Sequence, residues 1–463
     1  MRIHLLSDSP KSCSGFSNVC KNLAMGLTIL GHDVSISGFQ TTFLEYYNGI
    51  QILPMATGLD EISQLQNNII KTNSEILIYI NDGYTDARKF ITVFPRTITY
   101  TPIEGFDIPN HMIINLNRVA ENSIRVSENG RVVAQCSYGF KEMKKAGINV
   151  CCYIYHGFNP DIFYPIDSNR IETESKFCFY KTEQGQSILD PKLLYTRGCE
   201  NCKFDIKEQI KCPFYREEKV IVSKYDNINN QWLQIEDVPI SKLRANINPS
   251  NKFMFLGVAA NHMIRKKLER LLKAYSILID TKQLADRICL HLHTNPISPT
   301  GIDLLEISNR LKIQNNVTFS YGNWSEQAVN ILYNISDVGV SASSSEGFGL
   351  DTLQSMTVGN PYIAPDCTSF TELIGEIIED PIRESKTIGP RGLLAKIQAD
   401  YMLQDLTYRS LVDEVDLASK MKEIYSDKKL RDQYSKNALK FASNYTWEKT
   451  CDQFNELIKT IST

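Results

Sequence analysis

Short apolar runs alternate with segments of helical periodicity through the first 165 residues of the chain. The apolar runs predict strands at residues 3–6, 34–36, 75–80, 97–100, 132–135 and 152–155. Between the first two runs, Val19, Leu23, Leu27 and Leu30 recur at the spacing of one helix face. Strands separated by helices favour a parallel sheet with both faces covered, and such sheets bind ligands at the carboxyl ends of their strands.

Apolar runs return after residue 250 and predict further strands at 253–258, 288–294, 317–322 and 338–342. Residues 411–442 have the periodicity of helices. The intervening residues 166–250 are rich in Lys, Glu, Asn and Tyr.

Length and charge narrow the class of protein. The chain of 463 residues is long enough for about three domains. Its net charge of -3 gives no electrostatic reason to expect nucleic acid as a partner. The N-terminal apolar run is too short for a signal peptide, and no run approaches the ~18 apolar residues of a membrane span. We therefore expect a cytoplasmic protein with at most peripheral membrane contact, in which most of the twelve cysteines are reduced.

Residues 336–356, SDVGVSASSSEGFGLDTLQSM, predict a strand, a turn and a helix. Gly347 and Gly349 have no Cβ and let the backbone come close to a ligand. The amides of the first helical turn favour an anion, whereas Glu346 is suited to accept hydrogen bonds from neutral hydroxyls. This combination suits a phosphate-linked sugar, and the alternative is a Gly-rich turn that enters an ordinary helix.

EGFGLDTLQSM, followed by GNPYIAPD and TEL, resembles the donor-site signature of the retaining glycosyltransferases of family 4 and their group 1 relatives. The resemblance implies an α/β fold of the GT-B type, with two doubly wound, Rossmann-like parallel-sheet domains facing a cleft. It places an acceptor-side domain at 1–165, a cysteine-containing insertion at 166–250 and a nucleotide-sugar-binding domain at 251–444. A C-terminal helix, about 445–463, is implied to pack back on the first domain. Its buried residues would be Trp447, Phe454 and Leu457.

In this family the first Glu of the motif contacts the transferred sugar, and a second Glu holds the nucleotide ribose. Glu346 matches the first, but Gln354 stands at the second position. Gln354 can still donate to and accept from a ribose diol, without charge. The resemblance therefore leaves donor affinity and nucleotide preference open.

The segment AANHMIRKKLERLLKAY, residues 259–275, resembles the phosphate-binding segment of the family. Lys266 matches the lysine of the family, Arg265 stands beside it, and Ala260 replaces a more distant arginine. The two cations would neutralise the diphosphate as it leaves. The alternative is a solvated basic helix face.

Loops of the first domain supply the acceptor-side candidates. SDSPKSCSGFSN resembles the N-terminal glycine loop of the family, with Gly15 kept and Ser17 at a second small position, although a plain turn capped by Ser17 explains the same residues. Asp82 and Glu104 each follow a strand, and each is a candidate to bind acceptor hydroxyls, to act as a base or to serve only as a turn residue. The catalytic His of the family is absent from the loop that holds Glu104. His156 lies near the hinge, where we favour a structural role.

Four cysteines in the predicted insertion form a candidate metal site. Cys199 and Cys202 have a spacing that can grip one tetrahedral ion, and Cys178 and Cys212 are the candidates to complete a structural zinc site. An iron–sulfur centre, a disulfide and unpaired thiols are the alternatives.

The sequence therefore predicts a retaining glycosyltransferase that moves a sugar from a UDP-, GDP- or ADP-sugar to a hydroxyl of a glycan, lipid or protein, with no cofactor required for catalysis. The implied catalytic residues are Glu346, Lys266, Arg265 and Glu104. The implied donor-binding residues are Gly347, Phe348, Gly349, Leu350, Gln354, Asn261 and Gly15, and the acceptor-side residues are Asp82, Ser17 and His156. Two alternatives stay open: a GT-B protein that binds sugar nucleotides with weak or no turnover, and an enzyme that glycosylates DNA, which would need a basic cleft.

Overall fold

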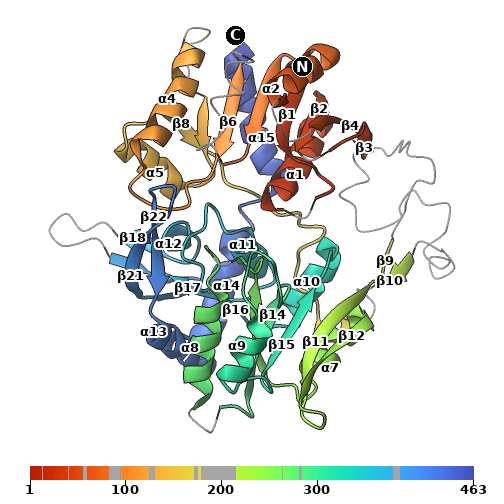
Figure 1. The fold of residues 1–463 in the computed structure, drawn as a ribbon, viewed down its shortest axis with the longest axis vertical. Helices are drawn as coiled ribbons and strands as arrows, with labels where there is room; N and C mark the ends of the chain where they lie inside the picture. The colour runs from red at the N-terminus through yellow and green to blue at the C-terminus, as the bar shows by residue number, and fades with distance from the viewer. Residues whose placement is uncertain are drawn as a thin grey trace.

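The computed structural model describes residues 1–12, 14–39, 41–55, 60–82, 94, 96–124, 131–171, 176–178, 215–262, 264–280, 284–378 and 386–462. Figure 1 shows two lobes, one above the other, each organised around a sheet. The N- and C-termini both lie on the upper lobe. Among the described helices, none is both long enough and apolar enough to cross a membrane.

The sheet of the first lobe has eight strands in the order β3-β4-β2-β1-β5-β6-β7-β8. All neighbours are parallel except β3 and β4, which are antiparallel at one edge. The strands are β1 (Arg2–Asp8), β2 (Asp33–Phe39), β3 (Glu45–Tyr47), β4 (Ile50–Met55), β5 (Ile76–Ile80), β6 (Thr97–Thr101), β7 (Val132–Ala134) and β8 (Val150–Tyr153). The parallel sheet predicted from the apolar runs is confirmed.

Apolar side chains from both faces of this sheet are buried under helices. Leu5 and Ile78 lie on one face with α1 and the C-terminal helix, and Leu6 and Leu77 lie on the other face. Every residue of β5 and β6 is buried, which is why these strands appear in the sequence as continuous apolar runs. The described helices between the strands of this sheet are α1 (Gly15–Ile29), α2 (Glu61–Thr72), α4 (Asn110–Ile124) and α5 (Ser137–Lys145).

The second lobe also has an eight-stranded sheet, in the order β12-β11-β15-β14-β13-β16-β17-β20. Its strands are β11 (Lys219–Asp226), β12 (Gln231–Pro239), β13 (Phe253–Val258), β14 (Ile288–His293), β15 (Val317–Tyr321), β16 (Val338–Val340), β17 (Tyr362–Pro365) and β20 (Gly392–Ala395). Its helices are α7 (Leu243–Ile247), α8 (Leu268–Asp280), α9 (Leu304–Arg310), α10 (Glu326–Asn334), α11 (Leu350–Thr357), α12 (Phe370–Leu373), α13 (Glu414–Ser426) and α14 (Lys428–Ala442).

Part of the predicted insertion belongs to this second sheet. Strand β11 pairs with β12 and with β15, both antiparallel, and the rest of the sheet is parallel. Val222 and Val238 are buried in the same core as Met254 of β13. The chain therefore joins the second sheet at Lys219, earlier than the predicted start at residue 251, because these strands bury their apolar face against the lobe.

The last helix, α15 (Trp447–Ser462), returns to the first lobe as predicted. Trp447 and Phe454 are buried there, and Leu457 is partly buried. The two chain segments that connect the lobes lie side by side. The Phe158 N–H donates to the carbonyl of Tyr445 at 3.0 Å, and the Trp447 N–H donates to the carbonyl of Phe158 at 3.1 Å.

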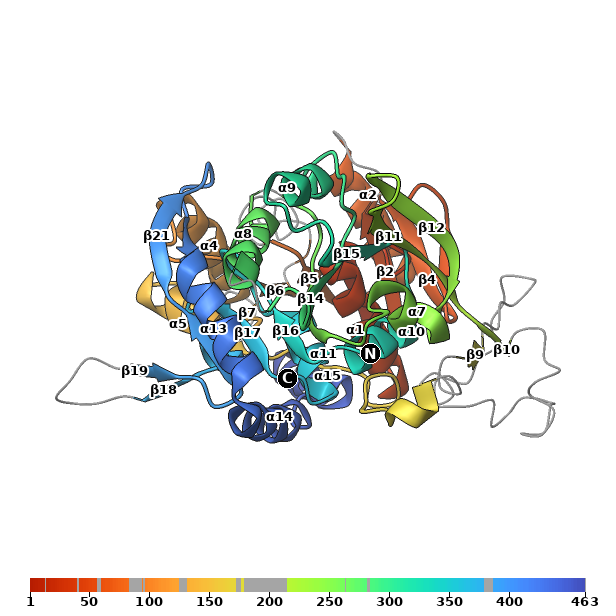
Figure 2. The same cartoon turned by 90° about the horizontal axis from the view of Figure 1, so that it is seen from below.

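Three small two-stranded sheets complete the described structure. They are β9 (Lys176–Cys178) with β10 (Tyr215–Glu217), β18 (Glu376–Ile378) with β19 (Lys386–Ile388), and β21 (Ile397–Met402) with β22 (Tyr408–Val412). Figure 2 shows the first two projecting from opposite sides of the molecule. The third sheet corrects the prediction that helices begin at residue 411. Leu411 lies in β22, and the next helix, α13, begins at Glu414.

Candidate active site

Loops from both lobes meet at the carboxyl ends of their strands. In the second lobe Arg265 and Lys266 follow β13 and Glu346 follows β16, and in the first lobe Asp82 follows β5 and Glu104 follows β6. Arg265 Nη1 lies 3.2 Å from Glu104 Oε1, so the two strand ends face each other. The structure thus brings the four predicted catalytic residues into one group.

Glu346 binds two cations of its own lobe. Its Oε2 accepts a hydrogen bond from Arg265 Nη1 and its Oε1 accepts one from Lys266 Nζ, each at 2.5 Å. The side chain is only 8% exposed. Burial alone would raise the pKa of this carboxyl, but the charges of Arg265 and Lys266 outweigh it and hold the pKa at about 2. The carboxylate is therefore ionised, and its single negative charge is shared between the two cations.

Hydrogen bonds within the second lobe fix the turn that carries Glu346. Its backbone N–H donates to Thr368 Oγ1, and Ser369 Oγ donates to its carbonyl, both at 3.0 Å. Gly349 has a φ of +94°, which a side chain would disfavour, and α11 begins at the next residue, Leu350. The turn is therefore held by two residues just before the TEL segment, which the sequence alone did not indicate.

Gly347 and Phe348 pack against the first lobe and the hinge. A Cβ on Gly347 would lie 2.3 Å from the Cβ of Pro102, so glycine is needed here for the close approach of the lobes. The Phe348 ring is buried, with its centroid 4.7 Å from that of His156 and 5.8 Å from that of Tyr155. Both residues join the lobes, and their predicted donor contacts stay predictions.

Acidic groups of the first lobe crowd the same guanidinium. Burial would lower the pKa of Arg265, but Glu104 and Glu346 outweigh burial and raise it. Burial raises the pKa of Asp82 to about 7, and the nearby charge of Glu104 adds to the shift. Asp82 Oδ1 is buried and has no hydrogen-bond partner among the described residues. Asp82 can therefore gain or lose a proton near neutral pH.

The remaining donor-side candidates differ in what they contact. Leu350 and Gln354 are both half-buried on α11. Asn261 is buried, and its amide holds the loop between β14 and α9: Nδ2 donates to the carbonyls of Asn295 at 3.1 Å and Ile302 at 2.7 Å. The amide of Asn261 is therefore committed to that loop, and its predicted donor contact gains no support from this geometry.

Ser14 caps α1, so the interpretation of Ser17 as the cap is wrong. Ser14 Oγ accepts a hydrogen bond from the Ser17 N–H at 2.9 Å, and Ser17 Oγ donates to the carbonyl of Ser12 at 2.7 Å. A Cβ on Gly15 would meet no atom within 4 Å. Packing therefore does not require glycine at this exposed first position of the helix.

His156 is buried among aromatic rings at the hinge. Its ring centroid lies 5.8 Å from that of Trp447 and 5.5 Å from that of Tyr100. Burial lowers its pKa to about 3, so the ring is neutral. Neither ring nitrogen has a hydrogen-bond partner in the part of the chain that the structure describes. These contacts agree with the favoured structural role.

Arg409 of β22 is a buried cation between the lobes that the sequence did not indicate. It lies so close to the first lobe that a Cβ on Gly105 would be 1.8 Å from its Nη1. Next to it, Tyr408 and Phe106 form an antiparallel bridge between the lobes, with ring centroids 5.5 Å apart. Its charge lowers the pKa of Asp82, against burial and Glu104. Arg409 lies in none of the segments that resemble a family motif. It is also far from Arg265 in sequence, so the sequence did not connect the two residues.

Three of the predicted zinc ligands, Cys199, Cys202 and Cys212, lie outside the described residues. Cys178 ends strand β9. Within the described residues, no group of three or more His, Cys, Asp or Glu side chains is arranged to hold a metal ion. The structural zinc site therefore stays a prediction.

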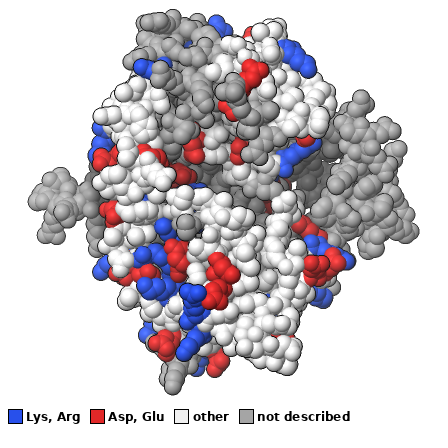
Figure 3. All heavy atoms as spheres, viewed as in Figure 1, with Lys and Arg blue, Asp and Glu red and all other residues white. Residues whose placement is uncertain are grey.

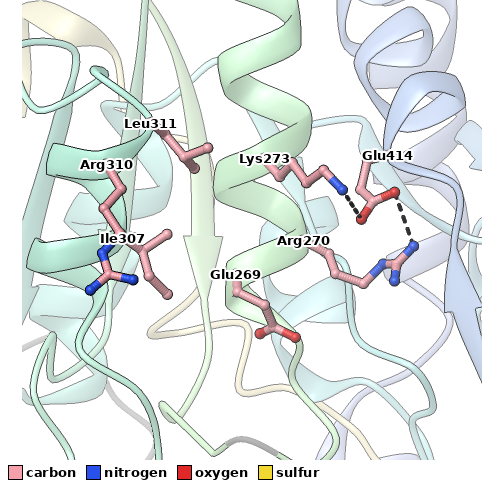
Figure 4. Close-up of a pocket in the computed structure, with 7 residues that line it drawn as sticks. All are labelled: Glu269, Arg270, Lys273, Ile307, Arg310, Leu311 and Glu414. Carbon is pink, nitrogen blue, oxygen red and sulfur yellow. Dashed lines mark hydrogen bonds and ion pairs between the residues drawn. The ribbon is translucent and has the colours of Figure 1, made fainter.

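A second carboxylate with two cations lies on the second lobe. Figure 4 shows Glu414, the first residue of α13, paired with Arg270 at 3.0 Å and Lys273 at 3.4 Å. These side chains border a surface pocket of about 360 Å³, which is also lined by Glu269, Ile307, Arg310 and Leu311. Glu414 thus repeats the two-cation arrangement of Glu346 without contributing to the group between the lobes.

One face of the molecule carries charges of both signs. On the face seen in Figure 3, acidic and basic side chains of the described residues are interspersed, and acidic atoms lie at the boundary between the lobes. A DNA-glycosylating enzyme would need a basic cleft, which this face does not show among the described residues.

Comparisons with known proteins support the resemblance. The family model described as "Glycosyl transferases group 1" matches residues 240–378, which contain Arg265, Lys266 and Glu346. No curated protein matches the chain in sequence.

Solved structures match over nearly the whole chain. Sucrose-phosphate synthase from Thermosynechococcus elongatus is 13% identical with a TM-score of 0.65, covering 99% of this chain and 98% of that one. A glycosyltransferase from Rickettsia africae ESF-5 is 16% identical with a TM-score of 0.61, covering 100% and 98%. Anabaena Alr3699/HepE in complex with UDP and glucose is 15% identical with a TM-score of 0.61, covering 99% and 100%.

These similarities confirm the predicted GT-B fold, and the family model supports sugar transfer as the class of activity. Membership of family 4, the stereochemistry and the identity of the sugar stay predictions.

Proposed function

We propose that this protein is a retaining glycosyltransferase that transfers a hexose from UDP-hexose to an acceptor hydroxyl. The observation that carries the proposal is the group of Glu346, Arg265 and Lys266 on one lobe, faced by Glu104 on the other. UDP is the first nucleotide to test because the similar Anabaena protein was crystallised with UDP and with UDP-glucose. GDP- and ADP-sugars are the further donors that the sequence leaves open.

On donor binding, the diphosphate takes over Arg265 and Lys266 from Glu346. Arg265 offers a planar fork and Lys266 a compact charge, which together suit two linked phosphates. The Glu346 carboxylate is then released to accept hydrogen bonds from hydroxyls of the sugar. As the bond between C1 and the phosphate oxygen breaks, the two cations stabilise the charge that develops on the leaving UDP.

The first lobe presents the acceptor. Its hydroxyl attacks C1 on the same face that the phosphate leaves, and its proton passes to the departing phosphate oxygen. We assign no covalent sugar–enzyme intermediate, because the released Glu346 carboxylate accepts hydrogen bonds from the sugar hydroxyls and Glu104 is paired with Arg265. Asp82, with its raised pKa, is placed to accept a hydrogen bond from the acceptor or to exchange its proton.

Arg265 and Lys266 take the place that a divalent cation has in other phosphate chemistry, so this mechanism needs no metal for catalysis. The predicted zinc at the insertion would be structural, and we expect the protein to act in the cytoplasm. Metal analysis of the purified protein before and after EDTA, with UDP release measured on the same samples, tests the metal-free mechanism and the structural role of the zinc. Loss of activity on EDTA treatment without unfolding would contradict the metal-free mechanism.

The proposal is tested by incubating the protein with UDP-, GDP- and ADP-hexoses and a panel of glycan, lipid and peptide acceptors. Nucleotide release is measured for the natural protein and for Glu346→Ala, and the anomeric configuration of the product is read by NMR. We expect a loss of ~100-fold or more in Glu346→Ala. Transfer unchanged within a few-fold would remove Glu346 from the mechanism.

The alternative is a GT-B protein that binds sugar nucleotides without turnover. It is favoured by Gln354 and Ala260, which replace charged residues of the resembled family. Calorimetry with the same donors separates the two, since donor binding without product at high enzyme concentration would support the binding protein.

A further inference from the structure

Two adjacent cysteines on β8 hold their sulfur atoms unusually close. Cys151 Sγ and Cys152 Sγ are 3.4 Å apart, although neighbouring side chains of a strand normally point to opposite faces. The pairing of β7 with β8 explains this. Val132 pairs with Val150 and Val133 pairs with Cys152, so Cys151 is an extra residue in the register. Such a bulge turns the side chain of the extra residue out of its regular direction.

The two thiols differ in exposure and acidity. Cys151 is exposed and Cys152 is partly buried at the free edge of the first sheet. The contact with the Cys152 thiol lowers the pKa of Cys151, although burial opposes it, and the charge of Lys144 adds to the lowering. The contact with Cys151 and burial raise the pKa of Cys152. An exposed thiol of lowered pKa beside a second thiol is the arrangement in which one attacks an oxidant and the other resolves the product.

Five other cysteines whose side chains the structure describes do not share these properties. They are all buried: Cys20, Cys136, Cys289, Cys367 and Cys451. Burial raises the pKa of each. Small molecules can also reach the second thiol, because Cys152 lines a surface pocket of about 390 Å³ between β8 and α15. The chemistry of the pair is therefore available at the protein surface.

We propose that Cys151 and Cys152 form a vicinal dithiol that a hydroperoxide oxidises reversibly to a disulfide. The Cys151 thiolate attacks the peroxide, the O–O bond breaks, and Cys151 sulfenic acid forms with release of an alcohol or water. The Cys152 sulfur then attacks the Cys151 sulfur, the S–O bond breaks, and its hydroxide leaves as water with the thiol proton. The pair loses two electrons, and the peroxide gains them.

The geometry favours both closure and reopening. The sulfur atoms must approach from 3.4 Å to about 2.05 Å, a small movement for two side chains of an edge strand. The Cα atoms of adjacent residues are only about 3.8 Å apart, less than the usual span of a disulfide. The bond is therefore strained, and strained disulfides are the easily reduced ones.

Mass spectrometry tests the proposal on one tryptic peptide. Residues 146–170 end at Arg170 and contain Cys151 and Cys152 as their only cysteines. The folded protein is treated with hydrogen peroxide, blocked with N-ethylmaleimide and digested. We expect this peptide to lose two hydrogen atoms and take no label, and to take two labels after dithiothreitol. Two labels after peroxide treatment, or a link from either cysteine to another peptide, would overturn the proposal.

Two variants assign the roles of the thiols. In Cys152→Ser the sulfenic acid cannot be resolved, so dimedone should trap it at residue 151. In Cys151→Ser we expect no dimedone adduct on the peptide, and circular dichroism checks that both variants are folded. Trapping at Cys152 in the second variant at the rate seen for Cys151 would show that the bulge gives the pair no special reactivity.

Discussion

Replacing Glu346 with Gln tests whether its carboxylate competes with the donor for Arg265 and Lys266. The change keeps the shape of the side chain and removes its charge. In the natural protein each cation must give up a charge-assisted hydrogen bond to Glu346 before it can bind a diphosphate. Such bonds contribute about 1.5–3 kcal/mol each, so removing the charge should leave part of that amount to the ligand. We expect UDP alone to bind Glu346→Gln roughly tenfold more tightly, which corresponds to about 1.4 kcal/mol.

The same substitution should lower stability and activity. The pKa of Glu346 falls from an ordinary value of 4.5 to about 2, which corresponds to about 3 kcal/mol in favour of the ionised form. Because the folded pKa lies below the unfolded one, this stabilisation is present above about pH 5 and is lost as the pH falls toward 2. At pH 7 the variant should therefore melt at a lower temperature. Sugar transfer should fall because the hydroxyls of the sugar lose a charged acceptor.

Glu414→Gln is the matched control. Glu414 also holds one arginine and one lysine, Arg270 and Lys273, and is buried to a similar extent, but it borders the pocket of Figure 4. Glu414→Gln should lower the melting temperature and leave the UDP affinity unchanged. Titration calorimetry with UDP on the three proteins decides the question. Weaker or unchanged UDP binding in Glu346→Gln, or equal tightening in Glu414→Gln, would refute the competition.

Three further changes test other parts of the site. Lys266→Ala removes one charge expected on the leaving diphosphate, and UDP release should fall roughly 100-fold. Gly105→Ala puts a Cβ 1.8 Å from Arg409 Nη1 and should push the two lobes apart, so X-ray scattering should show a larger radius of gyration. Gly15→Ala is the control: its Cβ would meet no atom within 4 Å, and the radius should not change. The pKa of Asp82 is raised from 3.8 to about 7, so its ionisation destabilises the folded state as the pH rises through that range. Asp82→Asn should therefore raise the melting temperature at pH 8 but not at pH 4, and an equal shift at both would contradict this account.

The sequence predicts the parallel cores well, because fully buried strands leave continuous apolar runs. It fails where strands are exposed or pair with distant partners. In β21 (Ile397–Met402) only Ile397 and Tyr401 are partly buried. The strand therefore lacks the continuous apolar run from which a fully buried strand is predicted. The pairing of β11 with β15 joins segments about a hundred residues apart, and no periodicity within either one specifies the other.

The candidate site shows the same division. Glu346, Arg265 and Lys266 could be selected because each lies in a segment that resembles a family pattern. Their mutual ion pairs could not, because a motif describes which residues are present and not which of them bind each other. Arg409 and Thr368 were missed for a related reason, since they support the site from elements without a recognisable motif.

The paired connection at Phe158 and Tyr445 makes the second lobe an insert within the first. The chain leaves the first lobe and re-enters it at one point, where Gly157 would place a Cβ 2.2 Å from the carbonyl carbon of Thr446. A gene fusing codons 1–157 to codons 446–462 through a short spacer should thus encode a self-contained first lobe. A chain truncated before Trp447 would instead expose the apolar sheet face that α15 covers, and it should aggregate during expression.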